Sequence, residues 1–505
     1  MDPGFRWVTT EKAMGDTLLV IDEGTTSTRA MLFAPGGACL GTAQREIGQH
    51  YPRPGWVEHD AEEIWSSSLA CAREMVEKAG GADRIAAIGI TNQRETILFW
   101  SRRTGRALAP AIVWQDRRTA GHCDALRDSG HEEMISRRTG LLLDPYFSAS
   151  KIAWALEHVP AVAEAGEDLC VGTVESWLMF RLTGGLHISD ATNASRTALM
   201  DIHHGRWDSD LLALWKVPAA VLPEIVDCAG GFGATLAEHF GQPIAIAGMA
   251  GDQQAAAIGQ ACLAAGDTKA TYGTGAFVLA NYGTEVPRSR NRLLATVAWQ
   301  LAGARIYALE GSMFVAGSLI KWLRDDLGLL ADAGESDALA RSVADSGGVR
   351  IVPAFAGLGA PHWHASARAA ITGLSFSTGR AHIVRAALEA MAHQTHDLMG
   401  CFAADGAAWN ILRIDGGMAA NDWLAQDLAD MLDLEVERPA LVETTALGAA
   451  MLAGVGCGLF ASLGEAAAMR GAVDSFSPAM AQDARAARLH GWEEALAMVL
   501  RARPE

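Results

Sequence analysis

LLVIDEGTTSTRAMLF (residues 18–33) and TKATYGTGAFVLANY (residues 268–282) repeat one pattern: an apolar run, a short glycine–threonine turn and a second apolar run. Apolar runs bounded by turn residues predict two strands joined by a tight turn. Glycines in such a turn let backbone N–H groups approach a ligand, and threonine hydroxyls add donors without charge. Because the pattern occurs once in each half of the chain, we expect two α/β domains whose turns face each other and grip a polyphosphate chain.

The segments around these hairpins predict the rest of two such domains. IAAIGIT (85–91), IAIAGMAG (244–251) and LRID (412–415) are typical of buried strands. SKIAWALEHV (150–159) predicts a helix with Ser150 as its N-cap and Pro160 closing it. NDWLAQDLADML (421–432) predicts a second helix, and the apolar stretch 447–460 a buried helix that is too short to span a membrane.

The domain boundary is expected close to residues 252–258. We therefore predict a first domain over residues 17–258 and a second over residues 259–505. Residues 1–16 have no apolar core typical of a secretory signal and are interpreted as a flexible leader, with Met14 as a candidate natural start.

Composition excludes some partners. The 505 residues include 41 Lys and Arg against 59 Asp and Glu, so 41 − 59 gives a net charge of −18. This acidity argues against nucleic acids and anionic membranes, which attract clustered basic residues, but it allows a small phosphate ligand. The 8 cysteines are dispersed without a CxxC pair, which favours a reducing, cytoplasmic setting.

Several motifs of other enzyme classes are absent or incomplete. The sequence has no Walker A motif, no protein-kinase HRD or DFG, no dinucleotide-binding GxGxxG after a strand and no GxSxG. Ser148-Ala-Ser-Lys151 matches SxxK, but its partner motifs are missing, so a helix start is favoured. His393 with His396, and His362 with His364, have no evident third ligand, which favours packing or surface roles over a metal site.

An ordered series of motifs resembles the FGGY family of carbohydrate kinases over nearly the whole chain from about Thr17. The motifs are IDEGTTSTRA (21–30), YPRPGWVEHD (51–60), IGITNQRET (88–96), AIVWQDRRTA (111–120), DPYFSASK (144–151), TNASRT (192–197), AGDQQAA (250–256), TYGTGAF (271–277), EGSMFVAG (310–317), VPAFAGLGAP (352–361), DGGMAAN (415–421) and TTALGAA (444–450). The resemblance implies two ribonuclease-H-like α/β domains of the actin/hexokinase type flanking a deep cleft.

The resemblance also implies a nucleotide site made by both halves. Asp22 would be a Mg²⁺ carboxylate, through water, because a buried Asp without a partner is costly and a nearby cation would offset that cost. A plain tight hairpin would explain the glycine of the turn but not this Asp. The residues expected to contact the nucleotide are Gly24, Thr25, Thr26, Ser27, Arg29, Gly273, Thr274, Gly317, Lys321, Gly417 and Asn421.

Asp252 resembles the catalytic aspartate of the family and would act as a general base on an alcohol, with a second role beside Mg²⁺. It follows the predicted strand 244–251, which would place its carboxylate at the carboxyl end of that strand. An Asp that caps the following helix is a respectable alternative, and the residue could do both. Removing such a base costs ~10²–10⁴ in rate.

A small polyol needs hydrogen-bonding partners for its hydroxyls and apolar faces for its C–H edge. By resemblance the contacts are Arg94, Glu95, Trp114, Tyr146, Asp252, Gln253 and Phe277. Arg94 and Glu95 are neighbours and would point to opposite faces of a regular strand, so the chain must leave the strand for both to reach one ligand. Trp114 on its own would favour a core position, and its place in the motif series favours the site.

The expected function is therefore ATP-dependent phosphorylation of glycerol to sn-glycerol 3-phosphate, with Mg²⁺ as cofactor. The alternative is the same chemistry on another small polyol or a ketose, such as erythritol or a pentulose. A non-catalytic sensor with the same fold would be expected to lack Asp22 or Asp252, and both are present. We expect a homodimer or homotetramer.

Some positions depart from the family pattern. Glu23 stands where Gln is usual and would add a negative charge beside the phosphate turn, which Lys321, also in place of Gln, would partly offset. His362 and His364 lie in an altered segment. Residues 233–246 lack the glycine-and-arginine loop that binds fructose bisphosphate in some relatives, and His239 is interpreted as a solvent-exposed residue rather than a phosphorylation site.

Overall fold

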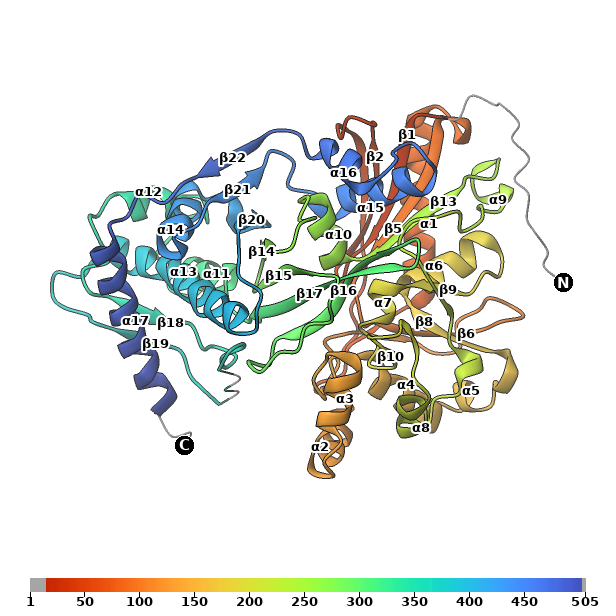
Figure 1. Ribbon diagram of the computed structural model, residues 1–505, viewed down its shortest axis with the longest axis horizontal. Helices are drawn as coiled ribbons and strands as arrows, with labels where there is room; N and C mark the ends of the chain where they lie inside the picture. Colours follow the sequence, from red (N-terminus) through yellow and green to blue (C-terminus); the bar gives the residue numbers. More distant parts are fainter. Residues whose placement is uncertain (1–14, 363, 365, 502–505) are drawn as a thin grey trace.

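The computed structural model describes residues 15–362, 364 and 366–501. Most of the predicted leader, including Met14, lies outside the described residues. The chain forms two lobes, and each is built around a central β-sheet (Figure 1). The first sheet has the strand order β13-β5-β1-β2-β3, and the second has the order β16-β17-β15-β14-β20-β21-β22.

The two central sheets share a core topology. In the first, β1, β2 and β3 are antiparallel neighbours, and β5 and then β13 add in parallel beside β1. In the second, β14, β15 and β17 are antiparallel, and β20 and then β21 add in parallel beside β14. The strands of the two sheets are β1 (Thr17–Glu23), β2 (Ser27–Phe33), β3 (Cys39–Glu46), β5 (Ile85–Asn92), β13 (Ile246–Gly251), β14 (Asp267–Tyr272), β15 (Ala276–Gly283), β16 (Leu294–Leu301), β17 (Ala304–Met313), β20 (Ile411–Asp415), β21 (Val436–Pro439) and β22 (Val473–Phe476). The prediction of a duplicated hairpin is confirmed, with the turns after β1 and β14.

Smaller sheets and helices surround these cores. The other strands are β4 (Glu58–His59), β6 (Ile97–Ser101), β7 (Ala111–Ile112) and β8 (Leu169–Thr173) in a four-stranded sheet, and the pairs β9 (Ile188–Asp190) with β12 (Glu224–Val226), β10 (Met200–Asp201) with β11 (Arg206–Trp207), and β18 (Arg350–Val352) with β19 (Ala370–Thr372). The helices are α1 (Ala61–Ala79), α2 (Ala120–Asp128), α3 (Glu132–Thr139), α4 (Ser148–His158), α5 (Pro160–Ala163), α6 (Val174–Thr183), α7 (Ala191–Ala194), α8 (Ser209–Trp215), α9 (Ala237–Phe240), α10 (Asp252–Gly259), α11 (Gly317–Asp325), α12 (Glu335–Arg341), α13 (Arg380–Ala404), α14 (Asp422–Leu432), α15 (Thr444–Gly456), α16 (Leu463–Ala466) and α17 (Gln482–Arg501).

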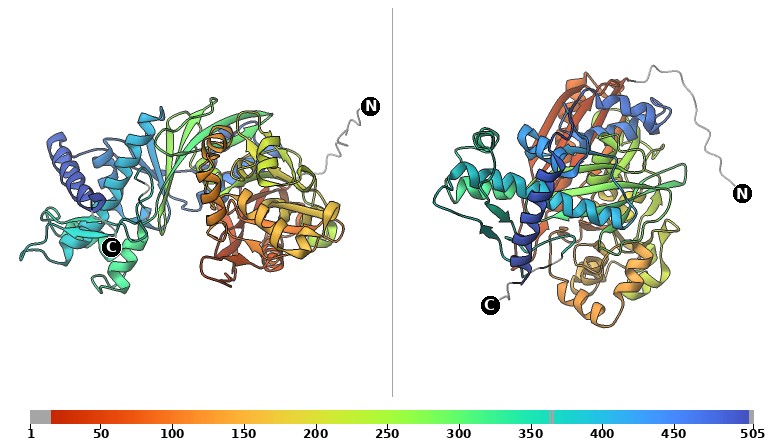
Figure 2. Two further views of the ribbon diagram at one scale, coloured as in Figure 1. Left: turned by 90° about the horizontal axis from the view of Figure 1, so that it is seen from below. Right: turned by 60° about the vertical axis from the view of Figure 1, so that its left-hand side comes forward.

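Strand β1 is buried on both faces, which explains its unbroken apolar run. Side chains alternate between the faces of a strand. Leu19 and Ile21 belong to a core cluster shared with α1, whereas Leu18 and Val20 belong to a cluster shared with α15. Helix α15 comes from the end of the chain and lies among the first strands, as the views of Figure 2 also show.

Helix α15 also packs closely against α10, which explains its composition of alanine and glycine. A Cβ atom on Gly448 would lie 1.8 Å from the carbonyl oxygen of Ala255, and one on Gly259 would lie 2.0 Å from that of Thr444. Only glycine permits this approach of the two backbones. The buried helix predicted for residues 447–460 is therefore confirmed, and it begins and ends a few residues earlier.

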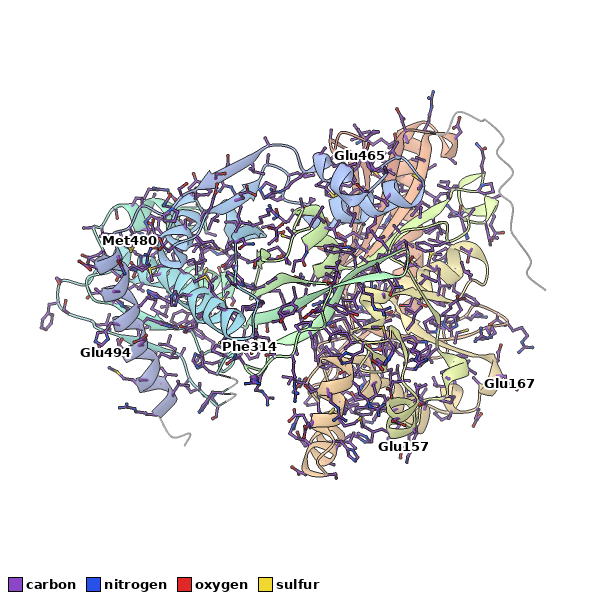
Figure 3. The ribbon with its side chains drawn as sticks, in the orientation of Figure 1. Glu157, Glu167, Phe314, Glu465, Met480 and Glu494 are labelled. Atoms are coloured by element: carbon purple, nitrogen blue, oxygen red, sulfur yellow. The ribbon has the colours of Figure 1, made fainter. Side chains whose placement is uncertain are left out.

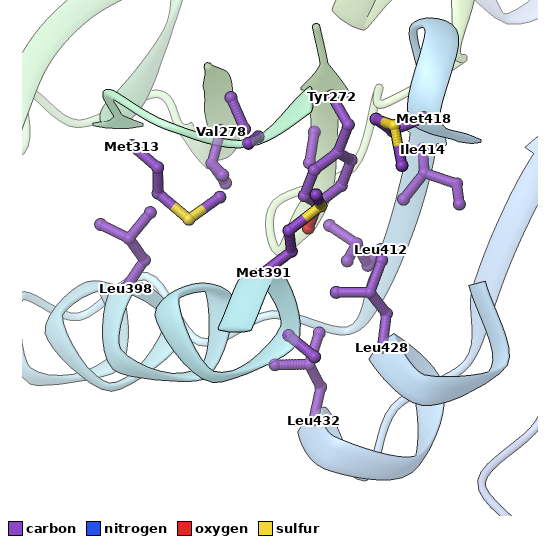
Figure 4. Close-up of a cluster of buried hydrophobic side chains, with 14 of the residues drawn as sticks. Tyr272, Val278, Met313, Met391, Leu398, Leu412, Ile414, Met418, Leu428 and Leu432 are labelled. Atoms are coloured by element: carbon purple, nitrogen blue, oxygen red, sulfur yellow. The ribbon is translucent and has the colours of Figure 1, made fainter. Parts of the chain in front are cut away.

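The second lobe packs α13 and α14 against its sheet. Figure 4 shows this core, in which Tyr272 of β14 and Met418 contact the same cluster as Met391 of α13 and Leu428 of α14. The hydroxyl of Tyr272 lies 2.8 Å from that of Thr395. Because Tyr272 precedes Gly273 and Met418 follows Gly417, this core fixes the positions of two glycine-rich turns.

The prediction for residues 150–159 needs a correction at its start. Helix α4 begins at Ser148, after Phe147. Ser150 lies in its first turn and is not the cap; its hydroxyl lies 2.8 Å from that of Thr119. Pro160 closes the helix as predicted, because α4 ends at His158 with Val159 as its C-cap, and Pro160 is also the first residue of α5. Proline is common at this position, where no N–H is needed.

The described residues include no helix that is both long and apolar enough to cross a membrane. All eight cysteines are free thiols. Most are buried, as the sequence predicted, and Cys39 is exposed.

Candidate functional site

Asp22 and Asp252 lie at the carboxyl ends of β1 and β13, two parallel strands on either side of β5. Asp22 of β1 and Ala250 of β13 both pair with Thr91 of the intervening strand β5. The two carboxylates are close enough for the charge of Asp252 to raise the pKa of Asp22. The structure therefore brings together the two acidic residues that the sequence singled out.

Asp22 is buried, but it has a protein partner. This corrects the sequence-based argument that a buried, unpaired Asp22 would need a nearby cation. Arg29 on β2 donates to its Oδ2 at 2.8 Å, and the same guanidinium contacts Glu443 at 2.5 Å. Burial raises the pKa of Asp22 to about 6, the negative charges of Asp252 and Glu443 add to this effect, and Arg29 opposes it. Glu443, which immediately precedes α15, was not predicted. The carboxylate pair of Asp22 and Asp252 would gain from a cation.

The first glycine–threonine turn connects β1 to β2. The N–H of Gly24 donates to the carbonyl of Ser27 at 3.0 Å, and the carbonyl of Gly24 accepts from Gln93 Nε2 at 3.0 Å. Thr25 accepts a hydrogen bond from Trp114 Nε1 at 2.9 Å, while Thr26 is exposed at the tip. The turn is thus held from the side where the predicted polyol contacts lie.

The second turn, residues 273–275, packs against the start of α11. The carbonyl of Gly273 accepts from the N–H of Gly317 at 2.9 Å, and that of Thr274 accepts from the hydroxyl of Ser318 at 2.8 Å. A Cβ atom on Gly317 would lie 2.6 Å from the Gly273 oxygen. Gly317 therefore permits the close contact between the turn and the helix. Figure 3 shows Phe314, just before this helix, on the side of the second lobe that faces the first.

Asp252 is the first residue of α10, directly after β13. Its Oδ1 forms an ion pair with Arg94 Nε at 3.1 Å and accepts from the backbone N–H of Gln253 at 2.6 Å. The side chain is 34% exposed, and its second oxygen has no partner among the described residues. The N-cap position belongs to Gly251, so the residue supports the helix through one N–H and still presents one oxygen.

Arg94 and Glu95 lie on a turn after β5. The chain has therefore left the strand, as it must if both side chains are to reach one ligand. Strand β5 ends at Asn92, and Glu95 has a φ of 62°, in the left-handed region. Both side chains are buried, with 3% and 1% of the residue exposed. A non-glycine residue in this region is costly and is held in place by its surroundings.

The aromatic residues predicted for the polyol site fall into two groups. Trp114 and Tyr146 contact each other edge to face with their ring centroids 5.6 Å apart. Phe277 lies on β15 of the second sheet, opposite Thr271 on β14. Gln253 accepts a hydrogen bond from Lys269 Nζ at 2.5 Å, which joins the first lobe to this second sheet.

Three buried charged residues at this site were missed by the sequence reasoning. Arg196 donates to Glu95 Oε1 at 2.6 Å and to Glu310 Oε1 at 2.9 Å, and Glu310 Oε2 accepts from Arg94 Nη1 at 2.5 Å. Lys269 is the third. Arg196 and Glu310 lie within the motifs TNASRT (192–197) and EGSMFVAG (310–317), and Lys269 lies in the first strand of the second hairpin, but none of these patterns indicated that the charged side chain is buried at the site.

The residues predicted to contact the adenine differ in how free they are to contact a ligand. A Cβ atom on Gly417 would meet nothing within 4 Å. Asn421 is the N-cap of α14, where its Oδ1 accepts from the N–H of Leu424 at 2.8 Å, and its Nδ2 donates to Ser336 at 3.0 Å. Lys321 is exposed on α11. Gly417 thus borders open space, and the side chain of Asn421 already has protein partners.

Glu23 does not add charge beside the phosphate turn, which corrects the prediction. It points to the opposite face of β1 from Asp22, is fully buried, and accepts from Ser68 of α1 at 2.8 Å. Burial raises its pKa to about 8, so the carboxyl is neutral at pH 7. No offset by Lys321 is needed.

The structure also shows the surroundings of His239, His362 and His364, which lie where the sequence departs from the family pattern. His239 is buried rather than exposed, which corrects the prediction; it packs edge to face on Trp65 and its Nε2 lies 3.1 Å from the carbonyl oxygen of Arg181. His362 Nε2 lies 3.7 Å from Asp397. His364 pairs through its backbone with Leu358. Neither departure contacts the site built above.

The described residues contain no group of three or more His, Cys, Asp or Glu side chains that could hold a metal ion. The two carboxylates of Asp22 and Asp252 are the available protein ligands at the site. A Mg²⁺ ion typically keeps several waters and takes one or two carboxylates together with substrate phosphates. The residues present fit an ion of that kind.

Two lobes of this topology, each with a glycine–threonine turn after the first strand of its core sheet, and a pair of carboxylates at the carboxyl ends of parallel strands define a two-domain phosphotransferase of the actin/hexokinase type. The model of the N-terminal domain of the FGGY family of carbohydrate kinases matches residues 17–259, and that of its C-terminal domain matches residues 268–457. The chain belongs to the FGGY family of carbohydrate kinases.

Relatives and solved structures narrow this class. The chain is 55% identical to a glycerol kinase of Gluconobacter oxydans, with 96% of each chain covered, and 54% identical to a glycerol kinase of Rhodospirillum rubrum, covering 95% of this chain and 98% of the relative. A crystal structure of Plasmodium falciparum glycerol kinase with ADP has a TM-score of 0.93 at 35% identity, covering 98% of this chain and 100% of that one. A xylulose kinase from Rhodospirillum rubrum has a TM-score of 0.86 at 26% identity, covering 96% and 99%.

Proposed function

We propose that this protein transfers the γ-phosphoryl group of ATP to glycerol and forms sn-glycerol 3-phosphate. The observation that carries the proposal is the position of Asp252, whose carboxylate lies beside Arg94 on one side and Asp22 on the other. A base beside hydroxyl-binding groups and a phosphate turn is the arrangement that phosphorylation of an alcohol requires. The full-length similarity to glycerol kinases supports glycerol over a larger polyol or a ketose.

Asp252 acts as the general base in this proposal. Its Oδ1 is held by Arg94 and by the N–H of Gln253, which fixes the carboxylate and leaves the other oxygen to accept the proton of the attacking hydroxyl. Arg94 and Glu95 bind the remaining hydroxyls, and Gln253 adds a further polar contact. Trp114, Tyr146 and Phe277 pack against the carbon chain. Holding the alcohol in this way supplies orientation that a bimolecular reaction lacks.

The nucleotide is proposed to lie between the two glycine–threonine turns. Exposed N–H groups and hydroxyls of the first turn, and the exposed Thr274 of the second, donate to phosphate oxygens. Gly417 borders the space for the adenine, and the remaining amide hydrogen of Asn421 is available to it. Movement of the lobes toward each other would exclude water from the reaction.

Mg²⁺ is proposed as the cofactor, held by Asp22 and Asp252 together with phosphate oxygens and water. When bound, the ion neutralises polyphosphate charge and aligns the transferred group. Arg29 would then either keep its present ion pairs with Asp22 and Glu443 or bind a phosphate of the nucleotide, because the carboxylates and the phosphate compete for the same guanidinium.

A coupled ADP-release assay tests the proposal. With ATP and glycerol, turnover should require Mg²⁺ and stop when the metal is chelated. Erythritol, dihydroxyacetone and pentuloses in the same assay distinguish glycerol from the alternative substrates. Turnover with a pentulose but not with glycerol would reject the proposed substrate and keep the reaction class.

Two further expectations belong to this proposal. The chain would work in a reducing, cytoplasmic setting, in keeping with its eight free thiols. It would assemble as a homodimer or homotetramer, which light scattering of the purified protein measures directly. The division of the chain after residue 258 also stays a prediction; it falls at the last residues of α10.

A further inference from the structure

A closed ring of four buried charges lies behind the proposed glycerol site. Arg94 contacts Glu310, Glu310 contacts Arg196, Arg196 contacts Glu95, and Glu95 is the chain neighbour of Arg94. The three ion pairs are 2.5, 2.9 and 2.6 Å long, and each of the four side chains is at most 2% exposed. Two positive and two negative charges make the ring neutral, which is the condition for burying it.

Glu310 is the only acidic member of the ring that comes from the second lobe. It lies on β17, where it pairs with Leu279 of β15, while Phe277 of β15 pairs with Ser312. Residues two apart on a strand share a face, so Glu310 and Phe277 lie on the same face of the second sheet. Each oxygen of Glu310 accepts from a different arginine of the first lobe.

Arg196 is the other residue of the ring that does not belong to the predicted site. It is fully buried on the segment after α7 and bridges Glu95 and Glu310. Its guanidinium also lies over the ring of Tyr146, with 5.7 Å between the guanidinium carbon and the ring centroid. Arg196 therefore contacts two of the predicted glycerol residues, and it reaches Arg94 through Glu310.

We propose that Glu310 and Arg196 are positioning residues that fix Arg94 and Glu95 for glycerol from behind and that Glu310 does so across the two lobes. This deepens the proposed function and rests on it. Glu95 has a strained φ of 62° and a buried carboxylate, so its orientation depends on Arg196. Without Glu310, both arginines would lose a partner, and each would turn toward Glu95 or Asp252.

The test compares Glu310→Gln with wild type in steady-state kinetics. Gln has nearly the same shape but no charge, and it cannot accept strongly from two arginines at once. We expect KM for glycerol to rise at least tenfold and KM for ATP to stay within twofold. Glu310→Asp, which restores the charge with a shorter reach, should recover part of the loss.

Glu437→Gln is the matched control. Glu437 also bridges two arginines, with its Oε2 3.0 Å from Arg413 Nε and 2.7 Å from Arg470 Nη1, but it lies away from the site. The control should leave KM for glycerol within twofold of wild type. A purely structural role for Glu310 would instead lower the unfolding temperature or affect both substrates equally, and would overturn the inference.

The remaining outcomes are also decisive. If wild type does not phosphorylate glycerol, the proposed function fails first, and this is visible before any variant is made. If wild type is active but Glu310→Gln keeps its KM for glycerol, the positioning role alone fails. If Glu310→Gln does not fold, Arg196→Lys, which keeps the charge but lacks the separated donors of the planar guanidinium, should show the same selective rise in KM for glycerol, and an unchanged KM there would overturn the inference.

Discussion

Replacing the buried Glu23 by Gln should stabilise the protein at alkaline pH. Burial raises the pKa of Glu23 from a usual 4.5 to about 8 in the folded chain. A group whose pKa is higher in the folded state holds its proton more tightly there, so its contribution to the free energy of unfolding is fully present below pH 4.5. That contribution falls as pH rises from 4.5, and the fall ends above about pH 8.

The size of this effect follows from the gap between the two pKa values. At 1.36 kcal/mol per pKa unit, the gap corresponds to about 5 kcal/mol of free energy of unfolding lost by wild type at high pH. The glutamine side chain of the Glu23→Gln variant keeps an acceptor for the Ser68 hydroxyl, but its amide replaces a carboxyl oxygen, Oε1, that has no hydrogen-bond partner. An unpaired buried group costs about 1–3 kcal/mol, so we expect a net gain of about 2–4 kcal/mol at pH 9.

Thermal unfolding of wild type and Glu23→Gln between pH 5 and pH 9 measures this gain. At pH 5 the variant should unfold at a slightly lower temperature than wild type because of its unpaired amide, and at pH 9 it should exceed wild type by about 2–4 °C, given a shift of about 1 °C per kcal/mol in a chain of this length. Glu437→Gln supplies a control of opposite sign, because two arginines lower the pKa of Glu437. A difference between wild type and Glu23→Gln that does not change with pH would refute the reasoning.

Three further changes probe the proposed site directly. Asp252→Asn should fold with an unchanged circular dichroism spectrum and lose ~10²–10⁴ in kcat, and near-normal turnover would remove Asp252 from the mechanism. Trp114→Ala removes the ring that contacts Tyr146 and the donor to Thr25, so KM for glycerol should rise by about tenfold; an unchanged KM would count against the pocket. Gly417→Ala adds a methyl group that meets no protein atom, so the unfolding temperature should not change while KM for ATP rises, and an unaltered KM for ATP would place the adenine elsewhere.

The sequence was sufficient for features that depend on local pattern. The hairpins around Gly24 and Gly273 followed from apolar runs separated by turn residues, because strand periodicity and turn chemistry are both local. The hairpin predictions needed no knowledge of what lies across the fold. The departure of Arg94 and Glu95 from their strand followed from side-chain geometry only once the family resemblance had assigned both residues to one ligand.

Long-range contacts were not predictable in the same way. Arg94 and Glu310 are separated by 216 positions, and Arg196 and Glu310 by 114, so no spacing rule connects them. The environment of Glu23 depends on which face of β1 it occupies and on Ser68, which arrives from α1. From the sequence alone, the charge of a residue can be assigned only from its reference pKa. Burial in the folded protein shifts that pKa and so changes the charge that the residue carries.

Two contacts from the second half of the chain support the acidic site of the first lobe. Helix α15 comes from the second half of the chain and covers the face of the first sheet that bears Leu18 and Val20, just before Asp22. Glu310 reaches from the second sheet to the arginine that holds Asp252. The acidic site of the first lobe is therefore supported by an apolar contact on one side and by an ionic contact on the other, both made by the second half of the chain. Because α15 packs with glycine contacts that allow little adjustment, whereas the Glu310 side chain can follow small movements, relative motion of the lobes should change the ionic contact first. That asymmetry links the geometry of the residues proposed to bind glycerol to the position of the second lobe.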